Sequence, residues 1–413
     1  MRRTAFSVAL LALGLLGAGC EDPELPREKP TTPTVPGPGE DGFEVVVPSS
    51  GTIGGITTMN ANNNLDVVRF QDRTFLAWRT APTHFASPQT KLYVASEGPD
   101  GWRYEGEFAL GTDLREPRFL VLNDKLFLYF AVLGMDGTKF EPQGMKLSEY
   151  QSPGSWTMPE DGYEPTFIPW RARVVNGTAY LIGYVGGEAI YSGSGNPIRI
   201  HFLKTSDGRN FEPVAPGKPV IQEGGGSETD FAFLDDGSLV AVTRNEAGDT
   251  TGWGSKICSA PANDLGTWTC NIDKKKYDSP LVFRHDKDVW LVGRRNLSNE
   301  SGNYDLDYDN LPPEEQTPAY LGEYSFGPKR CALWKVDPAT LTVEFVEDLP
   351  SRGDTCFASA IDNADSTVTI YNYSTELDGA PDCASWPDQC DDIPWFAGQG
   401  MPTIIYRTNV TFP

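Results

Sequence analysis

The chain is short of basic side chains. Its 413 residues include 34 Lys and Arg against 57 Asp and Glu, which gives a formal net charge of −23. Proteins that bind nucleic acid draw much of their affinity from basic groups that neutralise phosphates. The charge balance therefore excludes a general nucleic-acid-binding protein, and we expect no nucleic acid among the partners.

Histidine is scarce as well. The chain holds only His84, His201 and His285, and none of its seven cysteines has the spacing of a zinc finger. A structural zinc site needs a set of Cys and His ligands at characteristic spacings. We therefore expect no structural zinc, and we predict a protein without a metal or another cofactor.

The sequence begins with an apolar run that is too short to span a bilayer. Residues 5–16 are apolar, follow Arg2 and Arg3, and lead into small residues before Cys20, a pattern that predicts a signal peptide over residues 1–19. Residues 15–20 read LLGAGC and resemble a bacterial lipobox. The resemblance implies a lipidated Cys20 and an anchor in the cell envelope, at the outer membrane, in the periplasm or at the surface. An ordinary secretory signal would still export the protein.

Proline dominates the segment that follows. Residues 20–42 contain six prolines among Thr and charged residues, which predicts a semi-extended tether. We expect one folded domain over residues 43–413, as a monomer.

Six cysteines remain once Cys20 is assigned to lipid. Export to an oxidising compartment favours disulfides, and six thiols allow fifteen connectivities. One pair flanks a turn-like segment between two strand-like segments, and another would close a short loop rich in Asp and Pro. The pairs we favour are Cys258–Cys270, Cys383–Cys390 and, by remainder, Cys331–Cys356.

Beyond the tether, no segment carries a convincing apolar stripe of helical period over three turns. Short alternating segments are separated by turn signals about every ten residues, and the chain holds 42 Gly and 33 Pro. These features predict an all-β protein.

An internal repeat sharpens this prediction. In each copy an acidic residue opens a strand, a turn follows, and a second, very apolar strand ends in aromatic residues or Arg. Copies begin about 50 residues apart with two larger gaps, and four strands with their turns need about 40 to 50 residues. Six copies predict a six-bladed β-propeller. Their opening acids are Asp66, Glu116, Glu164, Glu228, Asp278 and Asp354.

Polar turns with Asp-Gly before an aromatic residue recur in the outer halves of the copies. Examples are residues 204–211 (KTSDGRNF), 96–102 (SEGPDGW) and 266–268 (GTW). These turns resemble the Asp-box hairpins of the sialidase superfamily of β-propellers. The resemblance covers roughly residues 66–406 and implies a sialidase-like propeller, in which such boxes are structural turns.

Residues 226–245 resemble a sialidase segment most. In that family a Glu opens the strand and polarises a nucleophilic Tyr, and an Arg sixteen residues later holds the substrate carboxylate; Glu228 and Arg244 match these places. The family's first arginine has no match in residues 65–68, and Arg115 stands one blade later. At the place of its tyrosine, the chain has Asp354. The tyrosine and the arginine triad of standard sialidase chemistry are therefore incomplete.

The repeated acids are the candidate site. Inner strands of a propeller surround a channel, and loops at one end form a bowl for ligands. We expect the six acids to form one ring there, beside a layer of Arg79, Arg244 and either Arg294 or Arg295. Glu228 is the predicted general acid or base, with Asp66 or Asp354 as its partner. The residues predicted to hold the ligand are Arg79, Arg115, Glu116, Glu164, Arg244, Asp278 and Arg295.

Three interpretations of these acids stay open. Glycoside hydrolysis needs two carboxyl groups about 5 to 9.5 Å apart, which a ring of acids could supply. The openings Glu116-Pro117 and Glu164-Pro165 are similar to those of five-bladed furanosidases. A non-catalytic module would use the same bowl to bind a glycan or a surface protein, and each acid could instead cap backbone amides. The predicted function is binding, with or without hydrolysis, of a glycan at the cell envelope.

Residues 296–328 form an acidic insertion. Asp305, Asp307 and Asp309 alternate as calcium ligands do, but the bidentate Glu and the sharp-turn Gly of an EF-hand loop are missing. The insertion is predicted to be a solvated acidic loop near the rim of the pocket.

Overall fold

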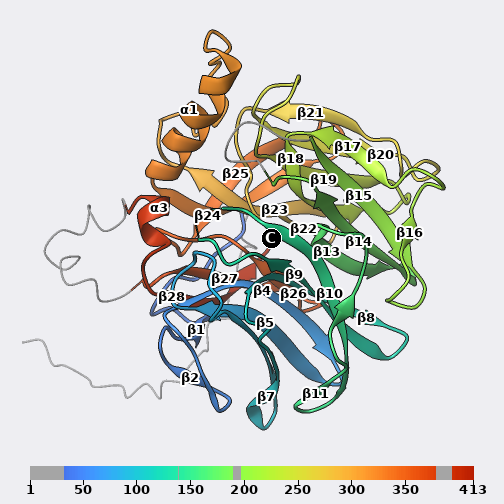
Figure 1. Cartoon of the computed structure of the whole chain (residues 1–413), viewed down its shortest axis with the longest axis vertical. Helices are drawn as coiled ribbons and strands as arrows, with labels where there is room; N and C mark the ends of the chain where they lie inside the picture. Colours follow the sequence, from blue (N-terminus) through green and yellow to red (C-terminus); the bar gives the residue numbers. More distant parts are fainter. Residues whose placement is uncertain (1–31, 138, 189–196, 378–392) are drawn as a thin grey trace, which may run out of the picture.

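The computed structural model describes residues 32–137, 139–188, 197–377 and 393–413. Six antiparallel sheets stand around a central channel, so the prediction of an all-β, six-bladed propeller is confirmed (Figure 1). The predicted signal peptide, Cys20 and the pair Cys383–Cys390 lie outside the described residues.

Each blade is one sheet, numbered here in chain order and given from its innermost strand outward. Blade 1 contains β4 (Ala61–Phe70), β5 (Arg73–Ala81), β6 (Lys91–Gly98) and β7 (Gly101–Phe108). Blade 2 contains β8 (Asp113–Leu122), β9 (Lys125–Leu133), β10 (Pro142–Ser152) and β11 (Ser155–Trp156), with β12 (Glu160–Asp161) beside β10. Blade 3 contains β13 (Ile168–Val175), β14 (Thr178–Val185), β15 (Ile198–Thr205) and β16 (Glu212–Pro213), with β17 (Val220–Gly224) beside β15.

The second half of the ring repeats this plan. Blade 4 contains β18 (Gly226–Phe233), β19 (Leu239–Asn245), β20 (Ser255–Ala260) and β21 (Thr269–Asp273). Blade 5 contains β22 (Leu281–His285), β23 (Asp288–Asn296), β24 (Lys329–Asp337) and β25 (Thr342–Leu349). Blade 6 contains β26 (Ser359–Asp362), β27 (Thr367–Thr375), β28 (Thr403–Thr411) and β1 (Phe43–Val47). A small hairpin, β2 (Thr52–Ile53) and β3 (Ile56–Thr57), connects β1 to blade 1.

The N-terminal part of the chain closes the ring. Strand β1 pairs antiparallel with β28, with Phe43 opposite Thr408. Thr34 and Thr411 exchange both backbone hydrogen bonds, at 2.9 and 3.0 Å, and Thr408 donates to the carbonyl of Pro36. The predicted tether is therefore wrong in its extent, because residues 34–42 dock along blade 6.

The core lies between neighbouring blades. The second strand of each blade is apolar on both faces because each face packs against another sheet; all residues of β9 except Lys125 are buried. Phe75 and Leu92 of blade 1 pack with Phe119 and Leu128 of blade 2 in one buried cluster. Each such side chain contributes about 1.5 to 3 kcal/mol through burial.

Two disulfides occur among the described residues. Cys258 and Cys270 lie opposite each other on β20 and β21, and Cys331 of β24 bonds Cys356 at the entry to blade 6. Both pairs agree with the prediction. The second pair joins blade 5 covalently to blade 6.

The acidic insertion contains a helix, so the prediction of a simple solvated loop is wrong. Helix α1 (Pro313–Phe326) projects from the rim of the ring, with the short helix α3 (Trp395–Gly398) beside it (Figure 1). Its Tyr320 and Tyr324 are buried with Trp253 and Tyr304. In the described ranges, no helix has the length and apolar character to cross a membrane.

Candidate functional site

The innermost strands bend where they begin, at one end of the channel, which we call the mouth. The pairing of β4 with β5 and of β8 with β9 is interrupted by bulges, and the residues in them, Asn64 and Glu116, have φ values of 41° and 49°. Left-handed backbone is costly for residues other than Gly and is frequent at functional sites. Each bulge interrupts the regular alternation of side chains along its strand and so changes the direction in which nearby side chains point.

Six carboxylates from blades 2 and 4 and from the segments that enter blades 5 and 6 gather at the mouth, and we call them the mouth carboxylates. They are Asp113, Glu116, Glu228, Glu246, Asp278 and Asp354. Four of the predicted site acids are therefore in this group.

Arg244 of β19 is the centre of the network in blades 4 and 5. Its guanidinium pairs with Glu228 and Glu246, and its Nε lies 3.0 Å from Oδ1 of Asp278. The second oxygen of Asp278 lies 2.8 Å from Nη1 of Arg294. Charged hydrogen bonds of this kind are stronger than neutral ones and hold planar guanidinium groups in fixed orientations. The network is thus pre-organised.

Glu228 also joins two blades through the backbone. Its Oε2 accepts a 2.7 Å hydrogen bond from the amide of Ser279, at the entry to blade 5. Burial raises the pKa of Glu228, and the Asp278 carboxylate adds to this increase, whereas Arg244 opposes it.

A second network connects blades 1 and 2. Asp113 lies 2.8 Å from Nη2 of Arg79 and 2.5 Å from Nε of Arg115, and all three groups are buried or nearly so. Arg115 also donates to the backbone carbonyl of His84, at 2.7 Å. This network fixes the loop that connects β5 to β6 above the mouth.

Asp354 is held by His84 from that loop and by Tyr373 of β27. Nδ1 of His84 lies 2.6 Å from Oδ2 of Asp354, and the Tyr373 hydroxyl donates to Oδ1 at 2.9 Å. Burial lowers the pKa of His84, which therefore stays neutral near pH 7. His84 lowers the pKa of Asp354 against its burial, and burial together with Asp354 raises the pKa of Tyr373 well above its usual value. Tyr373 is thus a protonated hydrogen-bond donor.

Glu116 differs from the other mouth carboxylates. It alone contacts no Arg, Lys or His within 4.0 Å in the described part of the chain. Both of its oxygens lie 3.1 Å from the side-chain amide of Asn64. Burial raises the pKa of Glu116 to about 7, and the neighbouring Glu228 contributes to the increase. A carboxyl group with this pKa exchanges a proton near neutral pH.

The separate networks interact electrostatically at the mouth. Glu116 interacts with Glu228, Tyr373 with Glu116, and Asp354 with both Arg294 and Arg79. The mouth therefore brings together seven of the predicted residues, which are Arg79, Arg115, Glu116, Glu228, Arg244, Asp278 and Asp354.

Three predicted residues lie elsewhere, so the expected single ring of equivalent acids is wrong. Asp66 lies deeper in the channel. Glu164 precedes β13 and lies 3.0 Å from Nδ1 of His201 on β15, away from the axis. Arg295 pairs with Asp348 of β25 on the outer side of blade 5, because neighbouring strand residues point to opposite faces and Arg294 takes the inner one.

A different ring does occupy the channel at the level of Asp66. The carboxylate of Asp66 accepts a 2.8 Å hydrogen bond from the amide of Phe119 in the next blade, and the carboxylate of Asp230 accepts one from the amide of Val282. In blade 6, the hydroxyl of Ser359 accepts a hydrogen bond from the amide of Val67. Arg118 and Arg171 lie at the same register of β8 and β13, and Arg171 pairs with both aspartates. Counting residues backward from the turn between the first two strands of each blade would have identified this layer. The prediction used the first acidic residue of each copy instead, and this residue does not always belong to the layer.

Aromatic groups wall one side of the mouth. Nζ atoms of Lys276 and Lys329 lie 4.3 and 4.2 Å from the ring centre of Tyr324 in α1, and the Arg294 guanidinium lies 4.7 Å from that of Trp395 in α3. Such contacts stabilise buried cations. Burial and Arg294 lower the pKa of Lys329 to about 7. The insertion predicted to shape the pocket thus places Tyr324 against Lys276 and Lys329 beside the mouth carboxylates.

Comparisons in sequence give no relative: no protein-family model matches the chain, and no curated protein matches it. Solved structures do. Phage phi92 endosialidase has a TM-score of 0.57 at 10% identity, over 90% of this chain and 69% of its own. The complex of Trypanosoma rangeli sialidase with 2,3-difluorosialic acid also has a TM-score of 0.57, at 11% identity, over 89% of this chain and 58% of its own.

A protein of unknown function from Dyadobacter fermentans is similar over its whole length. Its TM-score is 0.56 at 13% identity, over 91% of this chain. At such identities the likeness concerns the fold alone. The resemblance to sialidases seen in the sequence is confirmed at that level, and the chain is a sialidase-like six-bladed β-propeller.

Proposed function

We propose that the chain is an exported, lipid-anchored protein of the bacterial envelope that binds a carbohydrate at the mouth. Export and lipidation rest on residues 1–20 alone. The observation that carries the binding proposal is the convergence of charged hydrogen-bonding groups from several blades on one mouth. The sialidase titles among the solved neighbours add support by analogy of fold.

The mouth suits a sugar because it offers fixed donors and acceptors in alternation. Carboxylates accept hydrogen bonds from hydroxyl groups, and the side chains of Arg115 and Arg244, which pair with mouth carboxylates, remain exposed at 17% and 12%. Guanidinium groups bind carboxylates in two-point geometry. A glycan that carries a carboxylate therefore fits this site best.

Hydrolysis of the bound glycan is a second candidate, favoured by the contrast between Glu116 and Glu228. Glycosidases use two carboxyl groups whose surroundings push their pKa values apart. Glu116, without a basic contact, would donate the proton to the leaving oxygen. Glu228, paired with Arg244, would act as the ionised partner, and Asp354 is the alternative partner.

Binding and hydrolysis can be separated by one set of proteins. The mature chain with Cys20→Ser would be tested on a glycan array and with chromogenic glycosides. We expect binding of acidic glycans, and release of chromophore if the site is catalytic. Binding without release would identify a binding module, and no glycan binding at all would refute the proposed function.

Variants locate the activity at the mouth. Glu228→Gln keeps the size of the side chain, so it should abolish hydrolysis, or weaken binding at least tenfold, while the protein stays folded. Glu164→Gln is the matched control, because Glu164 lies outside the mouth. Equal losses in both variants would contradict the assignment.

A further inference from the structure

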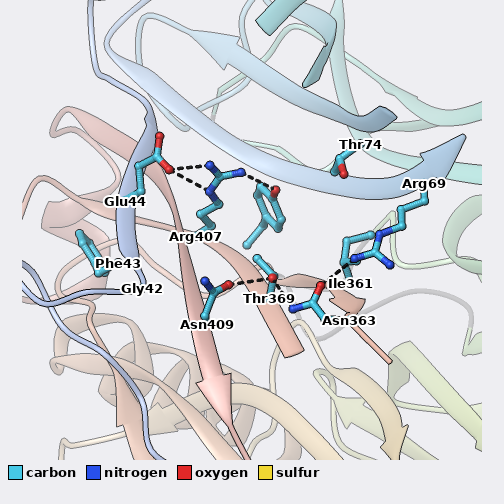
Figure 2. Close-up of a pocket in the computed structure, with 11 residues that line it drawn as sticks. Gly42, Phe43, Glu44, Arg69, Thr74, Ile361, Asn363, Thr369, Arg407 and Asn409 are labelled. Atoms are coloured by element: carbon cyan, nitrogen blue, oxygen red, sulfur yellow. Dashed lines mark hydrogen bonds and ion pairs between the residues drawn. The ribbon is translucent and has the colours of Figure 1, made fainter. Parts of the chain in front are cut away.

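A second polar pocket lies at the seam between blade 6 and blade 1, which we call the seam pocket (Figure 2). Its volume is about 510 Å³, within the range of small-molecule sites. Strands from both ends of the chain line it. The side chains used below are Glu44 of β1, Arg69 of β4, Asn363 after β26, Thr369 of β27, and Arg407 and Asn409 of β28.

The blade 6 wall of the seam pocket is a fixed polar surface. The amide of Asn363 donates to the hydroxyls of Thr367 and Thr369, at 3.0 and 2.9 Å. The hydroxyl of Thr369 donates to Asn409 at 2.8 Å (Figure 2). These bonds hold the side chains in place before any ligand arrives. Binding to such a surface costs little ordering entropy.

Two arginines line the seam pocket, and they differ in whether a carboxylate pairs with them. Arg407 pairs with two carboxylates, those of Glu44 and Glu97, and also donates to the Tyr371 hydroxyl. Arg69 is exposed and donates to the neutral side-chain oxygen of Asn363 at 2.7 Å (Figure 2). Arg69 forms no ion pair within the described ranges. The pocket therefore has one positive charge that lacks a carboxylate partner.

We propose that the seam pocket binds a small polyhydroxylated anion, a sugar acid or a sugar phosphate. The anionic group would meet the guanidinium of Arg69, and the hydroxyl groups would meet Asn363, Thr369 and Asn409. Ile361 and Phe43 supply limited apolar contact, as suits one face of a sugar ring. This site is separate from the mouth and does not depend on the function proposed there.

Such a ligand would bridge the two blades at which the ring closes. Arg69 belongs to blade 1, and the polar wall belongs to blade 6. A ligand that binds the folded state alone raises the stability of that state by RT ln(1 + c/Kd), where c is the free ligand concentration, so the gain grows with that concentration. Binding to the seam pocket therefore has a second readout in the melting temperature.

The test uses the mature chain with Cys20→Ser and three probes, which are glucuronate, glucose 6-phosphate and neutral glucose. Isothermal titration calorimetry should detect at least one anionic probe and much weaker binding of glucose. Comparison of the two anionic probes distinguishes a carboxylate from a phosphate as the preferred group. Arg69→Met should weaken that binding at least tenfold and remove the rise in melting temperature.

Two variants make the outcome specific. Arg199→Met removes an exposed arginine from blade 3 and should leave the binding unchanged. Arg115→Met alters the mouth and should also leave the seam binding unchanged. If neither anionic probe binds, or if binding survives in Arg69→Met and is lost in Arg115→Met, the proposal is overturned. Loss of glycan-array binding in Arg115→Met alone concerns the mouth and leaves the seam pocket standing.

Discussion

Nδ1 of His84 and the Asp354 carboxylate lie 2.6 Å apart, across the junction of the first and last blades. The pair links a loop of blade 1 to the entry of blade 6 and orients one of the mouth carboxylates. Since burial keeps His84 neutral, its N–H donates and Asp354 remains ionised.

This pair predicts a pH dependence of stability. The native pKa of His84 lies below the ordinary value of 6.5, so its contribution is fully present above pH 6.5 and is lost as the pH falls through the native pKa. We expect the free energy of unfolding to decline on acidification below pH 6.5. The decline should be smaller in His84→Gln, measured by urea unfolding at pH 7 and pH 5. The same pH slope in both proteins would contradict the buried neutral state of His84.

Glu116 predicts the opposite slope. Its native pKa of about 7 exceeds the ordinary 4.5, so its contribution is present at low pH and is lost as the pH rises from 4.5 through 7. At pH 8, Glu116→Gln should be more stable than the wild type by about 1 to 2 kcal/mol. If Glu116 is the acid in hydrolysis, kcat/KM should also fall above pH 7 in the wild type. Destabilisation by Glu116→Gln at pH 8 would show that the ionised carboxylate has a partner.

Asp66 should matter for stability and not for ligand binding. Asp66→Asn leaves Arg171 with less compensation and weakens the bond to the amide of Phe119, which should cost about 2 to 4 kcal/mol. Asp161→Asn, at an exposed ion pair on blade 2, is the control and should change stability by less than about 1 kcal/mol. Denaturant midpoints measure both, and glycan binding at saturating ligand should persist in Asp66→Asn. Loss of binding in a folded variant would extend the site into the channel.

The disulfide between blades 5 and 6 should stabilise both the ring and the mouth. Cys331 and Cys356 enclose a sequence separation of 25, for which loop entropy alone corresponds to about 3 kcal/mol. The double variant Cys331→Ala/Cys356→Ala should lose about that much stability and also weaken mouth binding, since Asp354 lies two residues away. Removal of Cys258 and Cys270, within blade 4, should lower stability without the second effect.

The architecture was predictable because each copy of the repeat carries a very apolar second strand, and most copies begin at the spacing that a four-stranded blade requires. The position of each acidic residue along the axis of the propeller was not predictable. Asp66 corresponds to Asp230, and a shift of two residues toward the start of the strand separates a channel position from a mouth position such as Glu228. The first acid of each copy therefore mixed two levels of the channel.

Several contacts and orientations at the site left no signal in the sequence. His84 and Asp354 are 270 positions apart, and only closure of the ring brings them together. Which of Arg294 and Arg295 points toward the mouth depends on which face of β23 each side chain occupies, and the sequence alone does not show this. Helix α1 contains Pro318 and has no marked amphipathic pattern, so the sequence did not indicate a helix whose tyrosines pack on Trp253.

The last sheet draws its outermost strand from the beginning of the chain. Until residues 403–411 have been synthesised, β1 has no strand to pair with and the circle of sheets stays open. Completion of the native structure must therefore wait for the synthesis of the last strand, β28. Any product truncated near its end would expose two unpaired strand edges, which makes such fragments prone to aggregation or proteolysis.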